Sequence, residues 1–368
     1  MAFRAVTPRQ QTRPAGGGIT SSASRILMEH VLPRFDQRLR DSVRPFDRDD
    51  LFRPHHDSRL WGWTHFGVFL PDLPDPYRYL NTMTLIGATG ATCFDNDHLA
   101  APDARNTATV LSSTAHADQH HYASYDASTD CTFARDGQHL RWGDDLALQV
   151  DLPHVTVDAS YATFDAHIEL TTTTTASWFV RSPVYDHVSL LAPYHATIRD
   201  REGNHDFTGL GTVEYARCLT PQSLRRSPLP ASFKLPFDFF TYQIINLDAE
   251  TQLLLTDVRV QGSTACRLAH VRTSGGRSTV YTSVTFEVVE AGEPLVDPIG
   301  RTMRAPARMR WAVRDEGRVL FQIEAVMDAP WRFGHGRGYV SAYSYTGQWR
   351  SKDIAGRGYV EWVDCEQH

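Results

Sequence analysis

The stretch Gly209-Leu-Gly-Thr-Val-Glu-Tyr-Ala-Arg-Cys218 returns near the end of the chain as Gly356-Arg-Gly-Tyr-Val-Glu-Trp-Val-Asp-Cys365. Each copy has the pattern Gly-x-Gly-x-Val-Glu-aromatic, with a cysteine at the same offset. A second pair lies upstream: Trp61-x-Trp63-x-x-Phe66 resembles Phe237-x-Phe239-x-x-Tyr242, and an aspartate follows eleven residues after the start of each. The two markers therefore occur twice in the same order. This predicts two related domains in tandem, which restricts the fold more tightly than any single motif.

Length and composition are those of a globular protein. The 368 residues are enough for two domains of ordinary size, each able to bury a core. The formal net charge of -6 argues against a nucleic-acid-binding surface. No stretch approaches the roughly 18 apolar residues that a membrane-spanning helix needs. The first 25 residues lack the apolar segment of a secretory signal.

The cysteines follow no recognised pairing or metal-binding pattern. Five are present, an odd number, and no two form a Cys-x-x-Cys pair. This spacing predicts neither a disulfide framework nor a zinc site. We therefore expect a reducing, cytoplasmic location and no bound metal.

Short strands dominate the predicted secondary structure. Runs of aromatic and β-branched residues predict strands at 61–70, 79–88, 106–113, 119–126, 129–135, 139–142, 146–150, 154–160, 163–175, 188–198 and 207–218. After a linker at 219–236, which holds four prolines, strands are predicted at 238–246, 251–260, 264–272, 279–289, 307–314, 318–326, 338–346 and 355–363. Residues 1–21 have the composition of a disordered arm, and Ser24 caps a predicted short helix that ends near Leu39.

Tight turns separate several of these strands. Asp136-Gly137 and Asp315-Glu-Gly317 supply residues that accept positive φ. Many short strands with such turns predict an all-β fold of antiparallel barrels or sandwiches. We expect a flexible arm with a short helix at 1–49, an N-terminal β-domain at 50–220 and a C-terminal β-domain at 232–368.

The repeated segments carry a family resemblance. Gly356-Arg-Gly-Tyr-Val-Glu361 and the aromatic strand Phe237-Asp-Phe-Phe-Thr-Tyr-Gln-Ile resemble segments of the carotenoid hydratase (hydroxyneurosporene synthase) superfamily. The resemblance implies two lipocalin-like β-barrel domains, in a group that includes Diels–Alder cyclases and plant-phenol hydratases. This sequence departs from the hydratases where Thr212 replaces a tryptophan and Glu214 an aspartate. It looks closer to an uncharacterised bacterial branch with His65-Phe-Gly and Phe94-Asp-Asn-Asp-His98.

Glu214 is the first candidate for a catalytic acid. On a strand it shares a face with Thr212 and Ala216. If that face lines a cavity, burial is expected to raise the pKa of the carboxyl, and a protonated glutamate can donate a proton to an alkene or a carbonyl. The alternative is a structural role, which the matching position of Glu361 in the second copy favours.

Asp97 and His98 form a second candidate site. They follow a predicted strand, at the level where the mouths of barrels lie, and an Asp/His cluster can shuttle protons. A loop held by Asx turns is the alternative. His65 lies among large aromatic residues, where it either orients a ligand or is a hydrogen-bonded core histidine.

Aromatic and acidic residues complete the candidate set. Predicted walls of a ligand cavity are Trp63, Phe66, Tyr242, Tyr345 and Trp349, each of which could equally belong to a barrel core. Asp238 is a further inward-facing acid or, alternatively, a strand-start cap. The run His116, Asp118, His120 and Tyr122 could face one side of a strand and hold zinc, but an exposed polar strand is the favoured interpretation.

These features lead to a functional hypothesis with two rivals. We expect an enzyme that binds a hydrophobic small molecule (terpenoid, polyketide or lipid-like) and hydrates, isomerises or cyclises it without a cofactor. Glu214 or Asp97 would act as the acid, and His65 and His98 would orient or relay. The rivals are a carrier that only binds a lipophile and a purely structural module whose barrels are filled by side chains.

Overall fold

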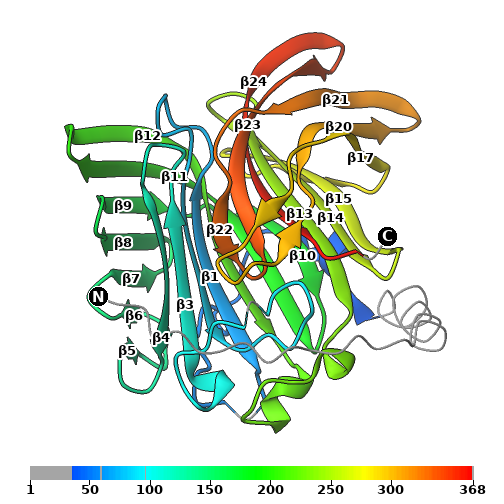
Figure 1. The fold of residues 1–368 in the computed structure, drawn as a ribbon. Coiled ribbons are helices and arrows are strands. Elements are labelled where there is room, and N and C mark those ends of the chain that lie inside the picture. The colour runs from blue at the N-terminus through cyan, green and yellow to red at the C-terminus, as the bar shows by residue number, and fades with distance from the viewer. Residues whose placement is uncertain (1–34, 59, 96, 367–368) are drawn as a thin grey trace.

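The chain forms two antiparallel β-sheets in sequence order, as the computed structural model in Figure 1 shows for residues 35–58, 60–95 and 97–366. The first sheet, here called unit 1, contains β1 (Trp63–Leu70), β2 (Leu80–Gly87), β3 (Thr107–Ser113), β4 (His120–Asp126), β5 (Cys131–Phe133), β6 (His139–Trp142), β7 (Leu146–Asp151), β8 (His154–Ser160), β9 (Asp165–Thr171), β10 (Ala176–Arg181), β11 (Tyr185–Asp200) and β12 (Gly203–Cys218).

The second sheet, here called unit 2, contains β13 (Phe237–Asn246), β14 (Thr251–Val260), β15 (Ser263–Thr273), β16 (Ser278–Tyr281), β17 (Val284–Ala291), β20 (Pro306–Asp315), β21 (Arg318–Met327), β22 (Arg332–His335), β23 (Gly338–Trp349) and β24 (Lys352–Asp364). A small ladder joins β18 (Leu295–Val296) to β19 (Thr302–Met303). The short helices are α3 (Arg38–Asp41), η2 (Ala104–Asn106), η3 (Pro221–Leu224) and η4 (Ala231–Phe233).

The repeated segments occupy the same topological place in both units. In unit 1 the order β3-β2-β1-β12-β11 puts the last strand beside the first, and in unit 2 the order β15-β14-β13-β24-β23 does the same. The two Gly-x-Gly-x-Val-Glu segments lie on β12 and β24. The predicted all-β fold of two antiparallel barrel-like units is confirmed.

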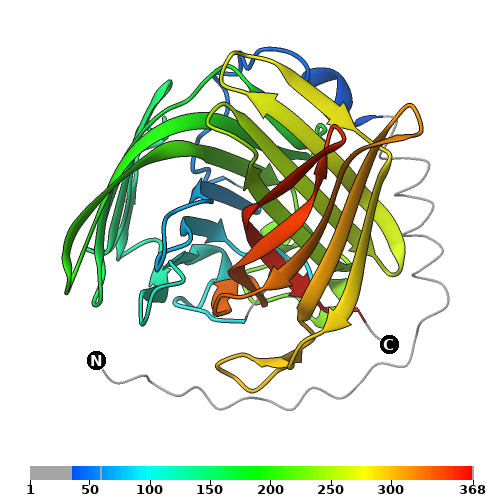
Figure 2. The same cartoon turned by 90° about the horizontal axis from the view of Figure 1, so that it is seen from above.

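Both sheets curl because their edge strands follow each other in the chain. The edges of unit 1 are β4 and β5, and those of unit 2 are β16 and β17. One sheet becomes a nearly closed barrel and the other a half-barrel, which Figure 2 shows from above. Such closure removes or shortens exposed strand edges.

Several local predictions need correction. The strand predicted at 279–289 is divided into β16 and β17, because the chain leaves its partner β15 and continues along β20. The predicted strand through the five threonines ends at Thr171, and β10, β18, β19 and β22 were not predicted. Of the predicted helix from Ser24, residues 24–34 lie outside the described residues, as does most of the predicted arm. The described part contains only α3.

Strand β1 is buried on both faces, which explains its nearly continuous apolar sequence. Phe66 and Val68 point into the core of unit 1. Phe69 points the other way and belongs to a core cluster with Tyr242 and Tyr359 of unit 2. The two units therefore share one apolar interface, and the outward faces of β1, β12, β13 and β24 meet in it.

Candidate functional site

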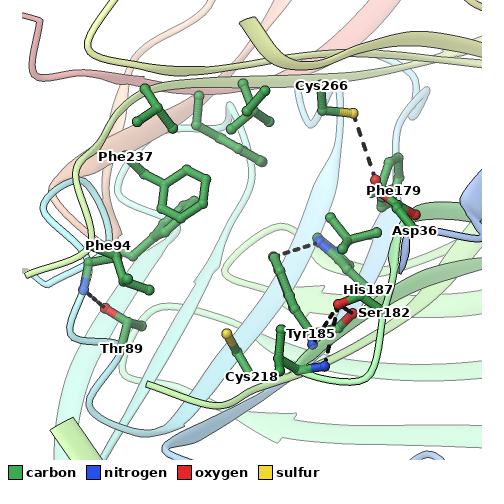
Figure 3. Close-up of a pocket in the computed structure, with 18 of the residues that line it drawn as sticks. Asp36, Thr89, Phe94, Phe179, Ser182, Tyr185, His187, Cys218, Phe237 and Cys266 are labelled. Atoms are coloured by element: carbon green, nitrogen blue, oxygen red, sulfur yellow. Dashed lines mark hydrogen bonds between the residues drawn. The ribbon is translucent and has the colours of Figure 1, made fainter. Parts of the chain in front are cut away.

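A cavity of about 260 Å³ lies where the two units meet (Figure 3). Its walls come from β1, β10, β11 and β12 of unit 1, from β13, β14 and β15 of unit 2, and from the segments that precede β13 and follow β2. Asp36 and Arg38 lie at its edge, where Arg38 Nη1 donates to the Phe179 carbonyl. Most of the lining is apolar or aromatic, including Trp63, Phe94, Phe179, Tyr185, Cys218, Phe237, Phe240 and Cys266.

His187 and Tyr242 are the cavity-lining residues that contact a buried carboxylate. The Tyr242 hydroxyl donates to Glu214 Oε1 at 2.6 Å, and His187 Nε2 lies 3.5 Å from Glu214 Oε2. Glu214 is only 2% exposed and lies behind these two side chains. Phe179 packs against both, with ring centroids 4.7 Å from His187 and 5.1 Å from Tyr242. The carboxylate can therefore act on a ligand only through His187 or Tyr242.

The pKa of Glu214 moves in the direction opposite to the one expected from burial alone. Burial raises it, but the nearby His187 imidazole, the Tyr242 hydroxyl and His65 together outweigh burial and lower the pKa below its ordinary value. Glu214 is therefore a carboxylate that keeps its charge. The expected role of Glu214 as a proton donor does not fit this environment.

The second repeat places its glutamate in a comparable set of groups. Glu361 is 3% exposed, accepts a hydrogen bond from the Tyr359 hydroxyl at 3.2 Å, and has His335 Nε2 at 3.5 Å from its Oε2. Burial and the charge of Glu214 raise the pKa of Glu361 well above its ordinary value. Each repeat glutamate thus lies in a His–Glu–Tyr set at the interface, but the two carboxyls have opposite preferences for a proton.

His65 joins the set around Glu214. Its Nδ1 is 2.7 Å from the Thr84 carbonyl, and its ring centroid is 6.2 Å from that of His187. Burial, with a further contribution from His187, lowers its pKa to about 4, so the ring is neutral near neutral pH. It is thus a hydrogen-bonded buried histidine, and it lies beside the predicted Glu214 and Tyr242.

Trp63 and Phe66 point in opposite directions. Trp63 lines the cavity. Phe66, three residues along the same strand, is in the core of unit 1 with its ring centroid 5.2 Å from that of Tyr215. Phe66 is therefore a core residue and not part of the cavity wall, because side chains alternate along a strand.

Asp97 and His98 lie at a separate place. Asp97 is paired with Arg301 at 2.9 Å, Lys234 at 3.4 Å and Arg337 at 3.5 Å. With His98 it borders a cavity of only about 40 Å³ that does not include Glu214. These ion pairs tie the segment around Asp97 to Arg301 and Arg337 of unit 2. The structure does not support a role for Asp97 as the acid.

Asp238, Tyr345 and Trp349 do not line the cavity. Both carboxylate oxygens of Asp238 accept from the Gln261 backbone N–H, at 3.1 and 3.0 Å, so this residue caps a turn. Burial raises its pKa to about 6. Tyr345 packs in the core of unit 2, and Trp349 lies beside it at the end of β23.

The histidine run on β4 is part of the packing. His120 Nε2 lies 2.7 Å from the Phe333 carbonyl, and His121 stacks on Tyr161 at 4.2 Å. Among the residues that the structure describes, no group of three or more histidine, cysteine or acidic side chains has an arrangement that could hold a metal ion. The cavity cysteines are poor nucleophiles, because burial raises the pKa of Cys218 to about 12 and that of Cys266 to about 11.

The prediction from sequence missed most of the partners of Glu214. His187 lies on β11 opposite β12, and only the pairing of those strands brings it to the carboxylate. Glu361 could have been chosen, because the repeat marks it as the counterpart of Glu214. Tyr359, two residues before it on the same strand face, would have followed. His335 and Arg272 carry no local signal of a buried site.

Comparisons with known proteins give a family but no activity. A family model described as "Family of unknown function (DUF6670)" matches residues 83–368. No curated protein matches the chain. A crystal structure of a protein of unknown function from the DUF3598 family of Nostoc punctiforme is similar at 12% identity and a TM-score of 0.15, and covers 86% of this chain and 100% of that chain. In the described residues, no helix has the length and apolar content required to cross a membrane.

Proposed function

The chain belongs to DUF6670, a family of unknown function, and we propose that it is a cofactor-independent enzyme that binds an apolar small molecule in the interface cavity and moves a proton on it. The proposal rests on one observation above all. His187 and Tyr242 line an apolar cavity with one side and contact the buried Glu214 with the other.

The cavity limits the class of substrate. Pockets for drug-sized ligands have volumes of about 300–1,000 Å³, and this one has about 260 Å³. A compact terpenoid, a small polyketide fragment or a short acyl chain is of suitable size, whereas a whole carotenoid is too large. The apolar lining favours a substrate whose binding energy comes from burial of hydrocarbon surface.

The arrangement of His187 and Glu214 supports proton transfer. An ionised carboxylate beside an imidazole stabilises the imidazolium, as in other acid–base pairs. His187 would take a proton from one carbon of the substrate and return it to another, so that a double bond shifts and no other reactant is needed. Isomerisation or cyclisation therefore fits better than hydration. His187 is the acid that reaches the ligand, and Glu214 stays ionised behind it.

The test uses the ligand that the protein carries through native purification. The bound compound is identified by mass spectrometry, offered back to the protein in heavy water, and examined for deuterium at carbon. We expect deuterium to enter with the wild type and to fall by at least about 100-fold with His187→Gln and Glu214→Gln, because general acid–base catalysis contributes about 10²–10⁴-fold.

Two exposed residues on β9 provide matched controls. His167→Gln and Glu169→Gln remove the same functional groups from the surface and should leave the exchange unchanged. A ligand that returns unlabelled from the wild type would reject catalysis. It would support a carrier instead, a function that the predominantly apolar lining also allows.

A further inference from the structure

Two carboxyl groups and a cation are buried around Tyr242 at the interface between the units. The carboxyls are Glu214 and Glu361, and the cation is the guanidinium of Arg272, which is completely buried on β15. Two charges of the same sign in a low-dielectric interior are costly unless each has a counter-charge. A cation that lies nearer to one carboxyl therefore favours the ionised form of that carboxyl over the other.

Arg272 is held against unit 1 by neutral groups. Its Nη1 donates to the Ser189 carbonyl at 2.8 Å and its Nη2 to the Ser189 hydroxyl at 3.1 Å, while Gln252 Oε1 accepts from Nη2 at 2.7 Å. Within the described residues no carboxylate lies at ion-pair distance from this guanidinium. A buried arginine without a paired acid needs a negative charge nearby.

Ser189 connects Arg272 to Glu214. On the β11–β12 ladder Ser189 is the residue directly opposite Glu214, and directly opposed residues have Cβ atoms about 5 Å apart. The guanidinium is thus one hydrogen-bonded residue away from Glu214. Burial lowers the pKa of Arg272 only to about 10, because the charge of Glu214 acts against it, so Arg272 remains a cation.

In the described part of the chain, Glu361 has no arginine or lysine in a position like that of Arg272 near Glu214. Its neighbours are the Tyr359 hydroxyl and His335, and burial, with His65 and His187, lowers the pKa of His335 to about 3. His335 is therefore a neutral ring. His187 Nε2 lies 3.5 Å from Glu214 Oε2, so a proton taken up by His187 would add a second positive charge near Glu214 and not near Glu361.

We propose that the two repeat glutamates have divided roles, with Glu214 the ionised partner of His187 behind the cavity, Glu361 a neutral partner that holds its proton at neutral pH, and Arg272 the positioning residue that keeps the charge on Glu214. This inference deepens the function proposed above and rests on it only for the catalytic use of the charge on Glu214. The charge assignment itself concerns the resting protein, so it can be tested without a substrate.

Infrared spectroscopy of the full chain at neutral pH separates the two glutamates. The wild type should show a carboxylic-acid C=O stretching band that is absent from Glu361→Gln. The same band should remain in Glu214→Gln and in the exposed control Glu169→Gln. Arg272→Met should add a carboxylic-acid band, because Glu214 then takes up a proton, and Glu214→Gln in that background should remove it. Loss of the band with Glu214→Gln, or no loss with Glu361→Gln, overturns the proposal.

Thermal unfolding gives a second, independent readout. Glutamine is a neutral isostere of a protonated glutamate, so Glu361→Gln should not lower the unfolding midpoint at neutral pH and is expected to raise it, because only in the wild type does the unfolded chain release a proton that the folded chain keeps. Glu214→Gln leaves Arg272 without its counter-charge and should lower the midpoint by about 5 °C or more. If Glu361→Gln fails to fold while Glu214→Gln folds normally, the assignment is wrong. Absence of deuterium exchange with correct infrared assignments would reject the enzyme and leave the charge division intact.

Discussion

Tyr242 connects the two buried glutamates in different ways. Its backbone lies opposite Glu361 on the β13–β24 ladder, and its hydroxyl donates to Glu214 across the interface. The ring also forms part of the cavity wall. One tyrosine of unit 2 thus completes the polar set of unit 1, and a substitution there should affect both units.

Tyr242→Phe should lower the free energy of unfolding by about 1.5–3 kcal/mol, because a hydrogen bond to a buried charged group is lost. Tyr359→Phe is the matched control. Its hydroxyl is 3.2 Å from Glu361, a carboxyl with a raised pKa, so the loss should be nearer 0.5–1.5 kcal/mol. Urea unfolding at neutral pH measures both. An equal or larger effect of Tyr359→Phe would contradict the assignment of charge to Glu214.

The raised pKa of Glu361 predicts a specific pH dependence. Below its ordinary value of 4.5 both folded and unfolded chains hold the proton. As the pH rises from 4.5 towards the folded-state pKa, only the unfolded chain releases this proton. The free energy of unfolding of the wild type therefore falls by up to about 1.4 kcal/mol per pH unit. The stability of Glu361→Gln relative to wild type should therefore increase with pH over this range.

Glu214 should change the free energy of unfolding with pH in the opposite direction, and so serves as an internal control. Its folded-state pKa is below 4.5, so its contribution is present above pH 4.5 and is lost as the pH falls through the folded value. Denaturant titrations of both glutamine variants between pH 3 and 8, a range of about five units, measure how the stability of each variant relative to the wild type changes with pH. The two changes should have opposite signs. Parallel curves would show that the two carboxyls titrate alike.

At the scale of elements, the turn between β22 and β23 positions His335. Gly336 has φ +58°, and a Cβ added there would lie 2.6 Å from Phe94 Cα and 2.8 Å from the Cys93 carbonyl oxygen. The close approach brings the turn of unit 2 against the 91–94 segment of unit 1. Gly336 therefore serves the contact between the units.

Gly336→Ala should consequently destabilise the protein by about 2–4 kcal/mol, because strain in the left-handed region adds to a clash with backbone atoms that cannot move aside. Gly317→Ala is the matched control: its φ is +81°, but nothing lies within 4 Å of the added Cβ, so only about 1–2 kcal/mol is expected. Chemical denaturation distinguishes them. Similar losses would mean that the contact with Phe94 is unimportant.

At the scale of the whole molecule, the two units are parts of one cooperative structure. Phe69, Tyr79 and Phe179 of unit 1 belong to the same buried cluster as the core of unit 2. Arg272 adds hydrogen bonds from β15 to β11. Separation of the units would expose this apolar surface together with buried polar groups, although unit 1 also has a separate core cluster of its own.

Calorimetry should therefore show a single unfolding transition with equal calorimetric and van't Hoff enthalpies. Phe179→Ala, which removes a ring that touches both His187 and Tyr242, should cost about 3–5 kcal/mol and leave one transition at lower temperature. As a control, Phe233→Ala removes a phenylalanine that is 68% exposed and should change little. Two resolved transitions in the wild type would show that the units unfold independently.

The fold was largely accessible from sequence because its signals are local. The turn at Asp136-Gly137 and the alternation on β8 and β9 need no distant partner to be recognised. The split of 279–289 was not accessible, because the chain changes partner there without a change in composition. The site was accessible only in part: Glu214, His65, Tyr242 and Trp63 come together, whereas Asp97 and Phe66 do not join them.

The repetition of Gly-x-Gly-x-Val-Glu by itself determined that the chain builds two like antiparallel units and that each carries one glutamate at the same strand position. Only the tertiary structure decided that these glutamates lie at a shared interface, that His187 lies against Glu214, and that Arg272 binds Ser189, the residue opposite Glu214. The reason is physical: β1 and most of β13 are buried on both faces, so strand periodicity cannot tell which face packs against the other unit. The proton preference of a buried carboxyl depends on what that face contacts.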